Sequence, residues 1–188
     1  MPSTLEAYHS SALCRSCGLC CDGTLYGRVP LTEDDAATLA TGQVQAQRES
    51  QLAQPCPHHG GGGCAVYLRR PVVCTRFSCK TLRRYQETQL SYRQAHEIIA
   101  KTVRLADRVR SRLHWELSVD AGPLPALYTA WEQAQPDART AAWAERNHTF
   151  LVDYGALLWQ LKRHFRPERK APSGEAEPSS GPRTRGAI

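Results

Sequence analysis

The eight cysteines of this chain constrain its fold more than any other feature. All of them lie between positions 14 and 79 of a 188-residue chain. Cys14, Cys17, Cys20 and Cys21 form a first run, and Cys56, Cys64, Cys74 and Cys79 form a second group. A two-residue spacer lets two sulfurs reach one ion, so this spacing is typical of zinc and iron–sulfur sites. We therefore expect the two ends of the segment to meet and to bind zinc or iron, the iron as an ion or in an iron–sulfur cluster.

The beginning of the chain carries no targeting signal. Residues 1–10 contain neither the basic nor the apolar segment of a secretory signal peptide. Nowhere is there a run of about 18 or more apolar residues of the kind that spans a membrane. These features predict a soluble, cytoplasmic protein that does not enter a membrane. Glutathione and thioredoxin keep cytosolic thiols reduced, which favours metal ligation over disulfides.

The neighbours Cys20 and Cys21 are difficult to place on one ion. Adjacent side chains diverge, so one of the two is expected to bridge, to serve a second metal or to stay unbound. Gly18 lies where a knuckle-like turn needs a residue that adopts a positive φ angle. The run departs from the ferredoxin pattern at its fourth cysteine, which argues against a ferredoxin.

The second cysteine group extends the pattern in three blocks. These are Cys56-Pro57, then glycine-cysteine-x-aliphatic-tyrosine at 63–67, then arginine-proline-x-x-cysteine-x-arginine-phenylalanine-x-cysteine at 70–79. With the first run, over roughly residues 14–82, they resemble the YkgJ-type cysteine-cluster family. The resemblance implies a zinc- or iron-chelating domain whose ligands are all eight cysteines. It implies a site and not a reaction.

His58 and His59 depart from the family pattern. They precede four glycines in the segment between Cys56 and Cys64, where the family more usually has an apolar residue and one glycine. Imidazole is a good zinc ligand, so either histidine could replace a thiolate. The eight cysteines already suffice for two four-coordinate sites, and we favour both histidines as exposed polar residues of a loop.

Local signals predict little regular structure around the cysteines. Thr32 is a candidate N-cap for a short helix from about Glu33 to Ala40. The segment 43–54 is polar and is expected to be an exposed connector. Ala65–Leu68 is predicted to form a short strand that pairs with Leu25–Leu31.

Beyond Cys79 the pattern becomes helical. Apolar residues recur at spacings of three, four or seven from Leu82 to Leu113, and the capping box of Ser91 and Gln94 favours two helices over one. Pro123 and Pro125 precede a short helix at 126–134, and Pro136 opens a last long helix. The expected buried stripe of that helix is Phe150, Leu151, Tyr154, Leu157, Leu158, Leu161 and Phe165. Trp115, Trp131, Trp143 and Trp159 are expected to pack in the core.

We therefore expect a mainly α fold with a small irregular cysteine-rich metal module and little β structure. The module should occupy residues 1–80, and a helical region packed on it should occupy residues 81–166. Residues 167–188 are rich in Pro, Ser, Gly and charge, which is typical of a disordered tail.

These features favour a metal-binding protein with a structural or carrier site. No Ser/His/Asp, phosphate-loop or paired-carboxylate constellation accompanies the cysteines, so we do not expect an enzyme. One alternative is an iron–sulfur redox or radical-chemistry accessory protein, and another is a zinc-stabilised nucleic-acid-binding module. The net charge of +6 and the basic stripe of Lys101, Arg104, Arg108 and Arg112 would suit nucleic acid. Because Glu97 lies four residues before Lys101, we favour a solvated, ion-paired face, and we leave a protein partner open.

Overall fold

The computed structural model describes residues 4–35, 51–61 and 63–167. Its helices are α1 (Thr4–Cys17), α3 (Val72–Arg76), α4 (Lys80–Gln86), α5 (Tyr92–Leu117), α6 (Leu124–Gln133), α7 (Ala141–Arg146) and α8 (His148–Gln160), with the 3-10 helix η1 (Tyr67–Arg69) and the π-helix η2 (Leu161–Phe165). Its strands are β1 (Arg28–Pro30), β2 (Gln51–Ala53), β3 (His59–Gly60) and β4 (Gly63–Cys64). The expectation of a mainly α fold with an irregular cysteine-rich module and little β structure is confirmed.

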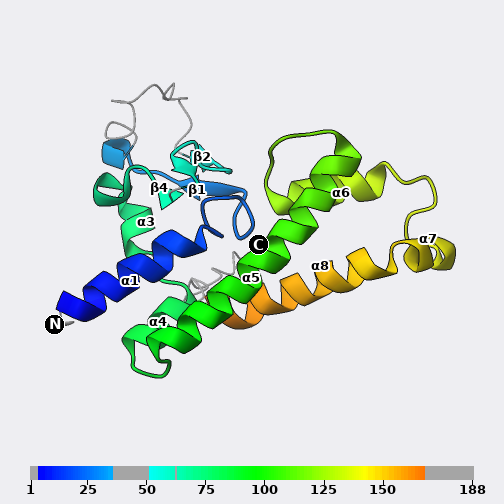
Figure 1. The fold of residues 1–188 in the computed structure, drawn as a ribbon. Coiled ribbons are helices and arrows are strands. Elements are labelled where there is room, and N and C mark those ends of the chain that lie inside the picture. The colour runs from blue at the N-terminus through cyan, green and yellow to red at the C-terminus, as the bar shows by residue number, and fades with distance from the viewer. Residues whose placement is uncertain (1–3, 36–50, 62, 168–188) are drawn as a thin grey trace, which may run out of the picture.

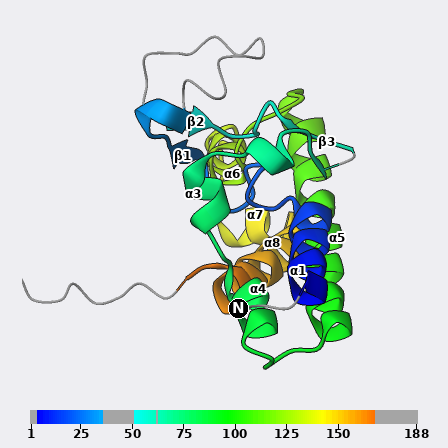
Figure 2. The ribbon, with the colours of Figure 1, turned by 90° about the vertical axis from the view of Figure 1, so that its left-hand side faces the viewer.

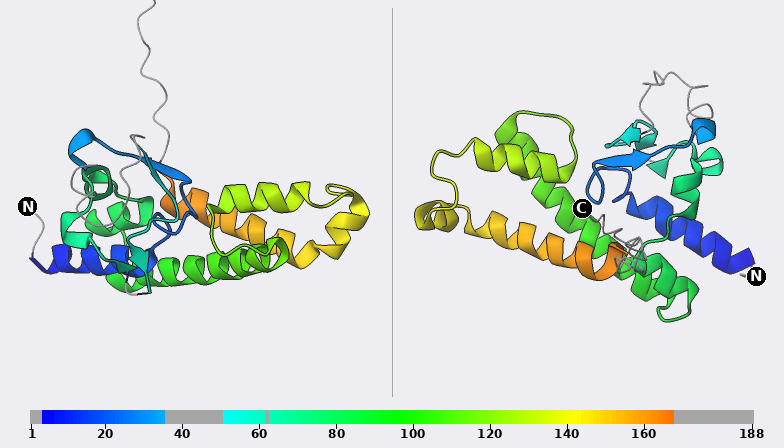
Figure 3. Two further views of the ribbon diagram at one scale, coloured as in Figure 1. Left: turned by 90° about the horizontal axis from the view of Figure 1, so that it is seen from above. Right: turned by 180° about the vertical axis from the view of Figure 1, so that it is seen from behind.

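Helix α5 is the central element of the molecule. α1, α4, α6 and α8 all pack against it, as Figure 1 shows. Seen from the side in Figure 2, α1 runs along α5. The cysteine-rich segment and the α6–α8 hairpin lie toward opposite ends of α5 in both views of Figure 3. One long helix therefore carries both the module and the helical hairpin.

The beginning of α5 confirms the prediction of two helices. The Ser91 side chain accepts a hydrogen bond from the Gln94 amide, and the Gln94 side chain accepts one from the Ser91 amide. This reciprocal capping starts a new helix and separates it from α4. The buried residues of α5 recur every three or four positions, which forms one apolar face: Ala95, Ile99, Thr102, Leu105, Ala106, Val109 and Leu113.

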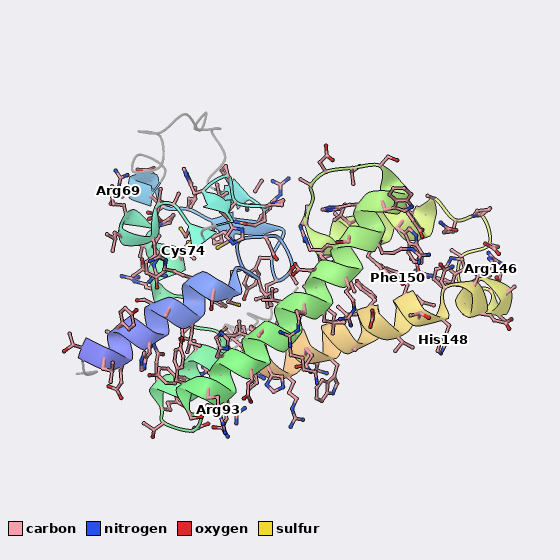
Figure 4. The ribbon with its side chains drawn as sticks, viewed as in Figure 1. Arg69, Cys74, Arg93, Arg146, His148 and Phe150 are labelled. Atoms are coloured by element: carbon pink, nitrogen blue, oxygen red, sulfur yellow. The ribbon has the colours of Figure 1, made fainter. Side chains whose placement is uncertain are left out.

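Aromatic side chains fill the space between α6, α7 and α8. Trp131 is fully buried and meets the Phe150 ring at a centroid distance of 4.6 Å. Tyr128 stacks on Tyr154 at 4.0 Å, and Trp143 is also buried. Such contacts are worth roughly 0.5–1.5 kcal/mol each beyond the burial of area. The expected core positions of Trp131 and Trp143 are confirmed, and Phe150 lies at the centre of the hairpin in Figure 4.

The prediction of one long C-terminal helix was wrong in its beginning and in part of its buried face. Thr140 caps α7, and α8 begins only after Asn147, whose side chain donates to the Trp143 carbonyl. Leu158 is 40% exposed and Trp159 is 54% exposed, because α8 packs on one side only. Trp115, on the outer side of α5, is 83% exposed and is likewise no core residue.

Strand pairing also differs from the prediction. β1 pairs antiparallel with β2, with Val29 opposite Leu52, so part of the expected connector is a strand. The segment predicted to pair with β1 forms η1 instead. Leu52 is the one buried residue of β2, and a three-residue strand is too short for alternation to identify it from the sequence.

Three predictions lie wholly or partly outside the described residues. Thr32 is an N-cap as expected, because its Oγ1 accepts from the Asp35 amide at 3.1 Å. The rest of the helix predicted to reach Ala40 is outside the described residues, as are residues 43–50 of the connector and residues 168–188 of the predicted tail.

Candidate metal centre

The first cysteine run begins on a helix that the sequence did not predict. Cys14 and Cys17 lie in the last turn of α1, and Gly18 then adopts a φ angle of +68°. The Gly18 carbonyl accepts hydrogen bonds from the amides of Cys21 and Asp22, at 2.7 and 2.9 Å. This tight turn reverses the chain directly after Cys17 and confirms the expected role of Gly18.

The second group reaches the first through the backbone. The Cys56 amide donates to the Cys21 carbonyl at 2.7 Å. The hairpin of β3 and β4 pairs His59 with Cys64, and a Cβ atom on Gly63 would lie 3.1 Å from the Arg15 carbonyl oxygen. The hairpin therefore packs closely against the end of α1, and the two ends of the cysteine-rich segment meet.

Cys74 and Cys79 are positioned by short helices. Cys74 lies on α3, and Figure 4 places it between the module's strands and helices, with Arg69 at the outer edge. Asp35 is buried and accepts hydrogen bonds from the Val72 amide, at 2.6 Å, and from the Thr32 amide, at 3.1 Å. Asp35, which the sequence did not single out, thus holds the first turn of α3.

The N-cap of α4 is Cys79 itself. Its sulfur accepts a hydrogen bond from the Leu82 amide at 3.5 Å. An N-cap normally carries an oxygen, so a sulfur in this position is partly stabilised by the positive end of the helix. The hydrogen bond from Leu82 therefore offsets part of the effect of burial, which raises the pKa of Cys79.

The thiols divide into two groups by their effects on one another. In the first group, burial raises the pKa of Cys17, and the charges of Cys79 and Cys14 raise it further. Burial also raises the pKa of Cys20 well above its ordinary value, and Cys17 and Cys79 contribute next. Cys14, Cys17, Cys20 and Cys79 are therefore close neighbours, and we call them the inner group.

The remaining four thiols form an outer group. Burial raises the pKa of Cys21 to about 12, and the charges of Cys56 and Cys64 are the next causes, with Cys14 and Cys74 contributing less. Burial raises the pKa of Cys74 to about 11, again with contributions from Cys56 and Cys64. Cys21, Cys56, Cys64 and Cys74 are thus neighbours, and Cys14 lies within range of both groups.

The division falls between two adjacent residues. Cys20 is affected most by Cys17 and Cys79, and Cys21 most by Cys56 and Cys64, while Cys21 also acts on Cys20 and Cys14 on Cys21, so the two groups adjoin and each contains members of both ends of the sequence segment. Cys79, from the far end, completes the inner group. The sequence arranges the cysteines as two runs, whereas the fold exchanges one member of each run.

A small cavity of about 50 Å³ lies beside the inner group. Its lining includes Cys14, Cys17, Cys20, Cys21 and Cys79, and its apolar walls include Leu13, Leu19, Phe77, Leu82, Ile99 and Phe165. In such surroundings a lone thiolate is unfavourable, and the raised pKa values of Cys17, Cys20 and Cys79 reflect this. A cation bound to several sulfurs would remove that cost.

The donor set fits zinc or iron, since thiolates select such metals. Among the residues that the structure describes, no three His, Cys, Asp or Glu side chains stand in the arrangement of a completed metal site. All eight cysteines are free thiols. The two groups are therefore gathered but not preformed, and an ion would have to draw the sulfurs together, as is usual when metal binding is coupled to folding.

A basic side chain accompanies the cysteines. Arg70 lies 3.8 Å from the Cys14 sulfur and 4.0 Å from the centroid of the Tyr67 ring. A guanidinium in this position offsets part of the charge of a thiolate-rich centre.

The prediction that both histidines are exposed loop residues was wrong. His58 and His59 are half-buried, and His59 begins β3, lies against Gly18 and lines an open cleft of about 740 Å³ together with Arg15, Asp22 and Asp107. The Nε2 atom of His58 is buried and has no hydrogen-bond partner among the described residues. The prediction that neither histidine replaces a thiolate is not tested by these positions.

Comparisons with known proteins agree with this geometry. Residues 13–98 match the CxxCxxCC family, whose model is described as a "Putative zinc- or iron-chelating domain". The match contains all eight cysteines together with α3, α4 and the capped start of α5. Neither curated proteins nor solved structures gave a match. In the described part of the chain, no helix has the length and hydrophobicity needed to cross a bilayer.

Proposed function

Because residues 13–98 match the CxxCxxCC family, we propose that this chain binds zinc or iron in two adjacent sites, each made by four cysteines. The inner site would use Cys14, Cys17, Cys20 and Cys79, and the outer site Cys21, Cys56, Cys64 and Cys74. The observation that carries this proposal is the different neighbours of Cys20 and Cys21: Cys17 and Cys79 act most strongly on Cys20, whereas Cys56 and Cys64 act most strongly on Cys21.

Four thiolates leave no open position on a tetrahedral ion. Closed sites of this kind contribute to folding, whereas catalytic zinc sites keep a position for water or substrate. The proposal therefore assigns the metal a structural or carrier role. Free thiols are needed for it, which is consistent with a protein of the reducing cytoplasm.

The residues around the thiols would support a bound ion in defined ways. The Leu82 amide would donate to the Cys79 sulfur, Arg70 would offset charge at Cys14, and Asp35 would keep α3 and Cys74 in place. A bound metal supplies a positive charge that keeps the buried thiols ionised at neutral pH. None of these residues needs to move a proton for this role.

The donor set suits an iron–sulfur centre as well as zinc, because both accept four thiolates. An iron–sulfur redox or radical-chemistry role is therefore the second candidate. The raised pKa of the inner thiols reflects an apolar environment, which excludes the water that destabilises such centres. The two candidates differ in iron and sulfide content and in colour.

The test is anaerobic purification of the full chain, followed by metal analysis, acid-labile sulfide analysis and a visible spectrum. We expect about two equivalents of metal for two mononuclear sites, and a binding protein of this type should retain its metal through purification. Less than about half an equivalent of any transition metal would contradict the proposal.

Substitutions then distinguish two sites from one. Cys20→Ser and Cys21→Ser are expected to lower the metal content by about one equivalent each, from different sites. In cobalt-loaded protein, each variant should keep the spectrum of the other four-sulfur site. Ser16→Ala, an exposed neighbour on α1, is the control and should leave both sites intact. Loss of all metal in both variants would indicate a single shared site.

A further inference from the structure

A basic surface lies where α4, α5 and η2 come together, and its first residue, Lys80, directly follows Cys79. α4 packs on both α5 and η2, as the lower part of Figure 1 shows. The Thr81 hydroxyl, which is buried, donates a 2.7 Å hydrogen bond to the His164 carbonyl and joins α4 to η2. These elements therefore hold a fixed arrangement relative to one another.

Four basic side chains from these three elements act electrostatically on the His164 ring. Burial lowers the pKa of His164, and the positive charges of Arg163, Arg84, Lys101 and Lys80 lower it further. A positive charge lowers the pKa of an imidazole in this way only when it lies near the ring. Residues that are up to 83 positions apart in the sequence thus contribute to one local concentration of positive charge.

Acidic residues are missing from the same segments. α4 and residues 154–166 contain no Asp or Glu, and neither do residues 98–106 of α5. Several basic residues elsewhere pair with carboxylates, as Arg108 does with Asp153 at 3.1 Å and Arg146 with Asp137 at 2.6 Å. Within the described residues, no carboxylate pairs with Arg84, Lys101 or Arg163. The predicted partner of Lys101, Glu97, pairs with Arg93 instead.

An exposed indole lies at the edge of this charge. Trp159 is 54% exposed, although all four tryptophans were expected to pack in the core. The Arg163 guanidinium lies 5.1 Å from its ring centroid, and His164 meets it edge-on at 6.1 Å. A large aromatic side chain beside several cations is the combination with which proteins bind single-stranded nucleic acid, through base stacking and phosphate contacts.

We propose that Trp159, Lys80, Arg84, Lys101 and Arg163 form a binding surface for single-stranded nucleic acid. The four cations contact phosphates, and the Trp159 ring stacks on an unpaired base. A duplex is a poorer ligand, because its bases already stack on one another and hide their faces. The surface goes beyond the proposed metal sites and uses none of their cysteines.

The first test measures binding of a fluorescently labelled oligothymidylate by anisotropy at several salt concentrations. It uses the full chain purified with its metal, and the metal content of every variant is determined. The triple variant R84Q/K101Q/R163Q is expected to bind at least about tenfold more weakly, with a salt slope smaller by about 2. The control R93Q/R139Q/R146Q removes the same net charge elsewhere and should bind as the parent protein does. Equal losses in the two triple variants would overturn the proposal, because net charge alone would explain them.

The second test uses the two exposed tryptophans as a matched pair. Trp159→Ala is expected to weaken binding about fivefold or more and to abolish the quenching of protein fluorescence by the oligonucleotide. Trp115 is 83% exposed, and Trp115→Ala should change neither the affinity nor the quenching. Unchanged affinity and quenching in Trp159→Ala would overturn the proposal.

Competition distinguishes the class of ligand. Unlabelled single strand should displace the labelled oligonucleotide, whereas a duplex of similar length and polyglutamate should do so much less well. Equal displacement by polyglutamate would overturn the assignment to nucleic acid. Retained oligonucleotide binding by a chain that fails to hold metal would contradict the proposed metal sites alone, so the two proposals fail separately.

Discussion

The amide of Cys56 donates a 2.7 Å hydrogen bond to the carbonyl of Cys21, and this contact joins the two ends of the cysteine-rich segment. The residues it connects are 35 positions apart, and both thiols belong to the outer group. The bond therefore holds the backbone of Cys56 against that of Cys21, within the group of thiols to which both belong.

Metal removal should loosen the cysteine-rich module more than the helices that follow it. The module contains few large buried side chains, namely Leu13, Leu19, Leu25 and Leu52, so apolar burial offsets its ordering entropy poorly. After complete chelation under reducing conditions, amide hydrogen exchange should accelerate over residues 14–79 and stay slow in α5 and α8. Cys17→Ala should have the same effect. Unchanged near-UV circular dichroism and protease resistance in the metal-free protein would contradict a structural role for the metal.

Gly18→Ala should destabilise the protein and disturb the hairpin of β3 and β4. The φ angle of +68° is unfavourable for alanine, and the added Cβ would lie 2.6 Å from Nε2 of His59. We expect a loss of about 1–3 kcal/mol in the free energy of unfolding, measured by urea denaturation. Gly155→Ala is the matched control, because nothing lies within 4 Å of its Cβ position on α8. It should leave stability unchanged or raise it by up to about 1 kcal/mol.

Asp35→Ala should destabilise the attachment of α3. The carboxylate is buried and accepts from the Val72 and Thr32 amides, so its removal leaves two donors without their partner. The expected loss is about 1–3 kcal/mol in the free energy of unfolding, together with weaker retention of metal at the outer group. Glu33→Ala changes an exposed acid two residues earlier and serves as the control. Equal stability of the two variants would show that the Asp35 contacts contribute little.

Leu157→Ala and Leu158→Ala should differ sharply although the residues are adjacent. Leu157 is fully buried, and its truncation is expected to cost about 2–5 kcal/mol through lost burial and a residual cavity. Leu158 is 40% exposed, and its truncation should lower the free energy of unfolding by less than about 1 kcal/mol. Thermal or urea unfolding of the two variants measures the difference. Similar losses would mean that α8 packs on both sides.

Local sequence signals were sufficient for much of the helical structure. The capping box at Ser91 and Gln94, the N-cap at Thr32 and the turn at Gly18 were all predicted and are all present. Each depends on residues within three or four positions of one another, so the sequence specifies them directly. Helix α1 and the break between α7 and α8 were not predicted, although Gly18 follows α1 directly and Thr140 caps α7. The exposure of Trp115 and Trp159 depends on which helices pack against α5 and α8. No local sequence pattern predicts that packing.

The chemistry of the cysteine-rich segment is a property of the sequence alone. Eight cysteines at these spacings predict soft thiolate ligands whatever the details of the fold. The proposed grouping of the thiols into two sets of four depends on tertiary structure. The assignment depends on the hydrogen bond between Cys56 and Cys21 and on the position of Cys79 at the start of α4, and both arise from contacts between distant residues. Side chains adjacent in the chain diverge in space, so sequence order alone does not pair Cys20 and Cys21 with their neighbours.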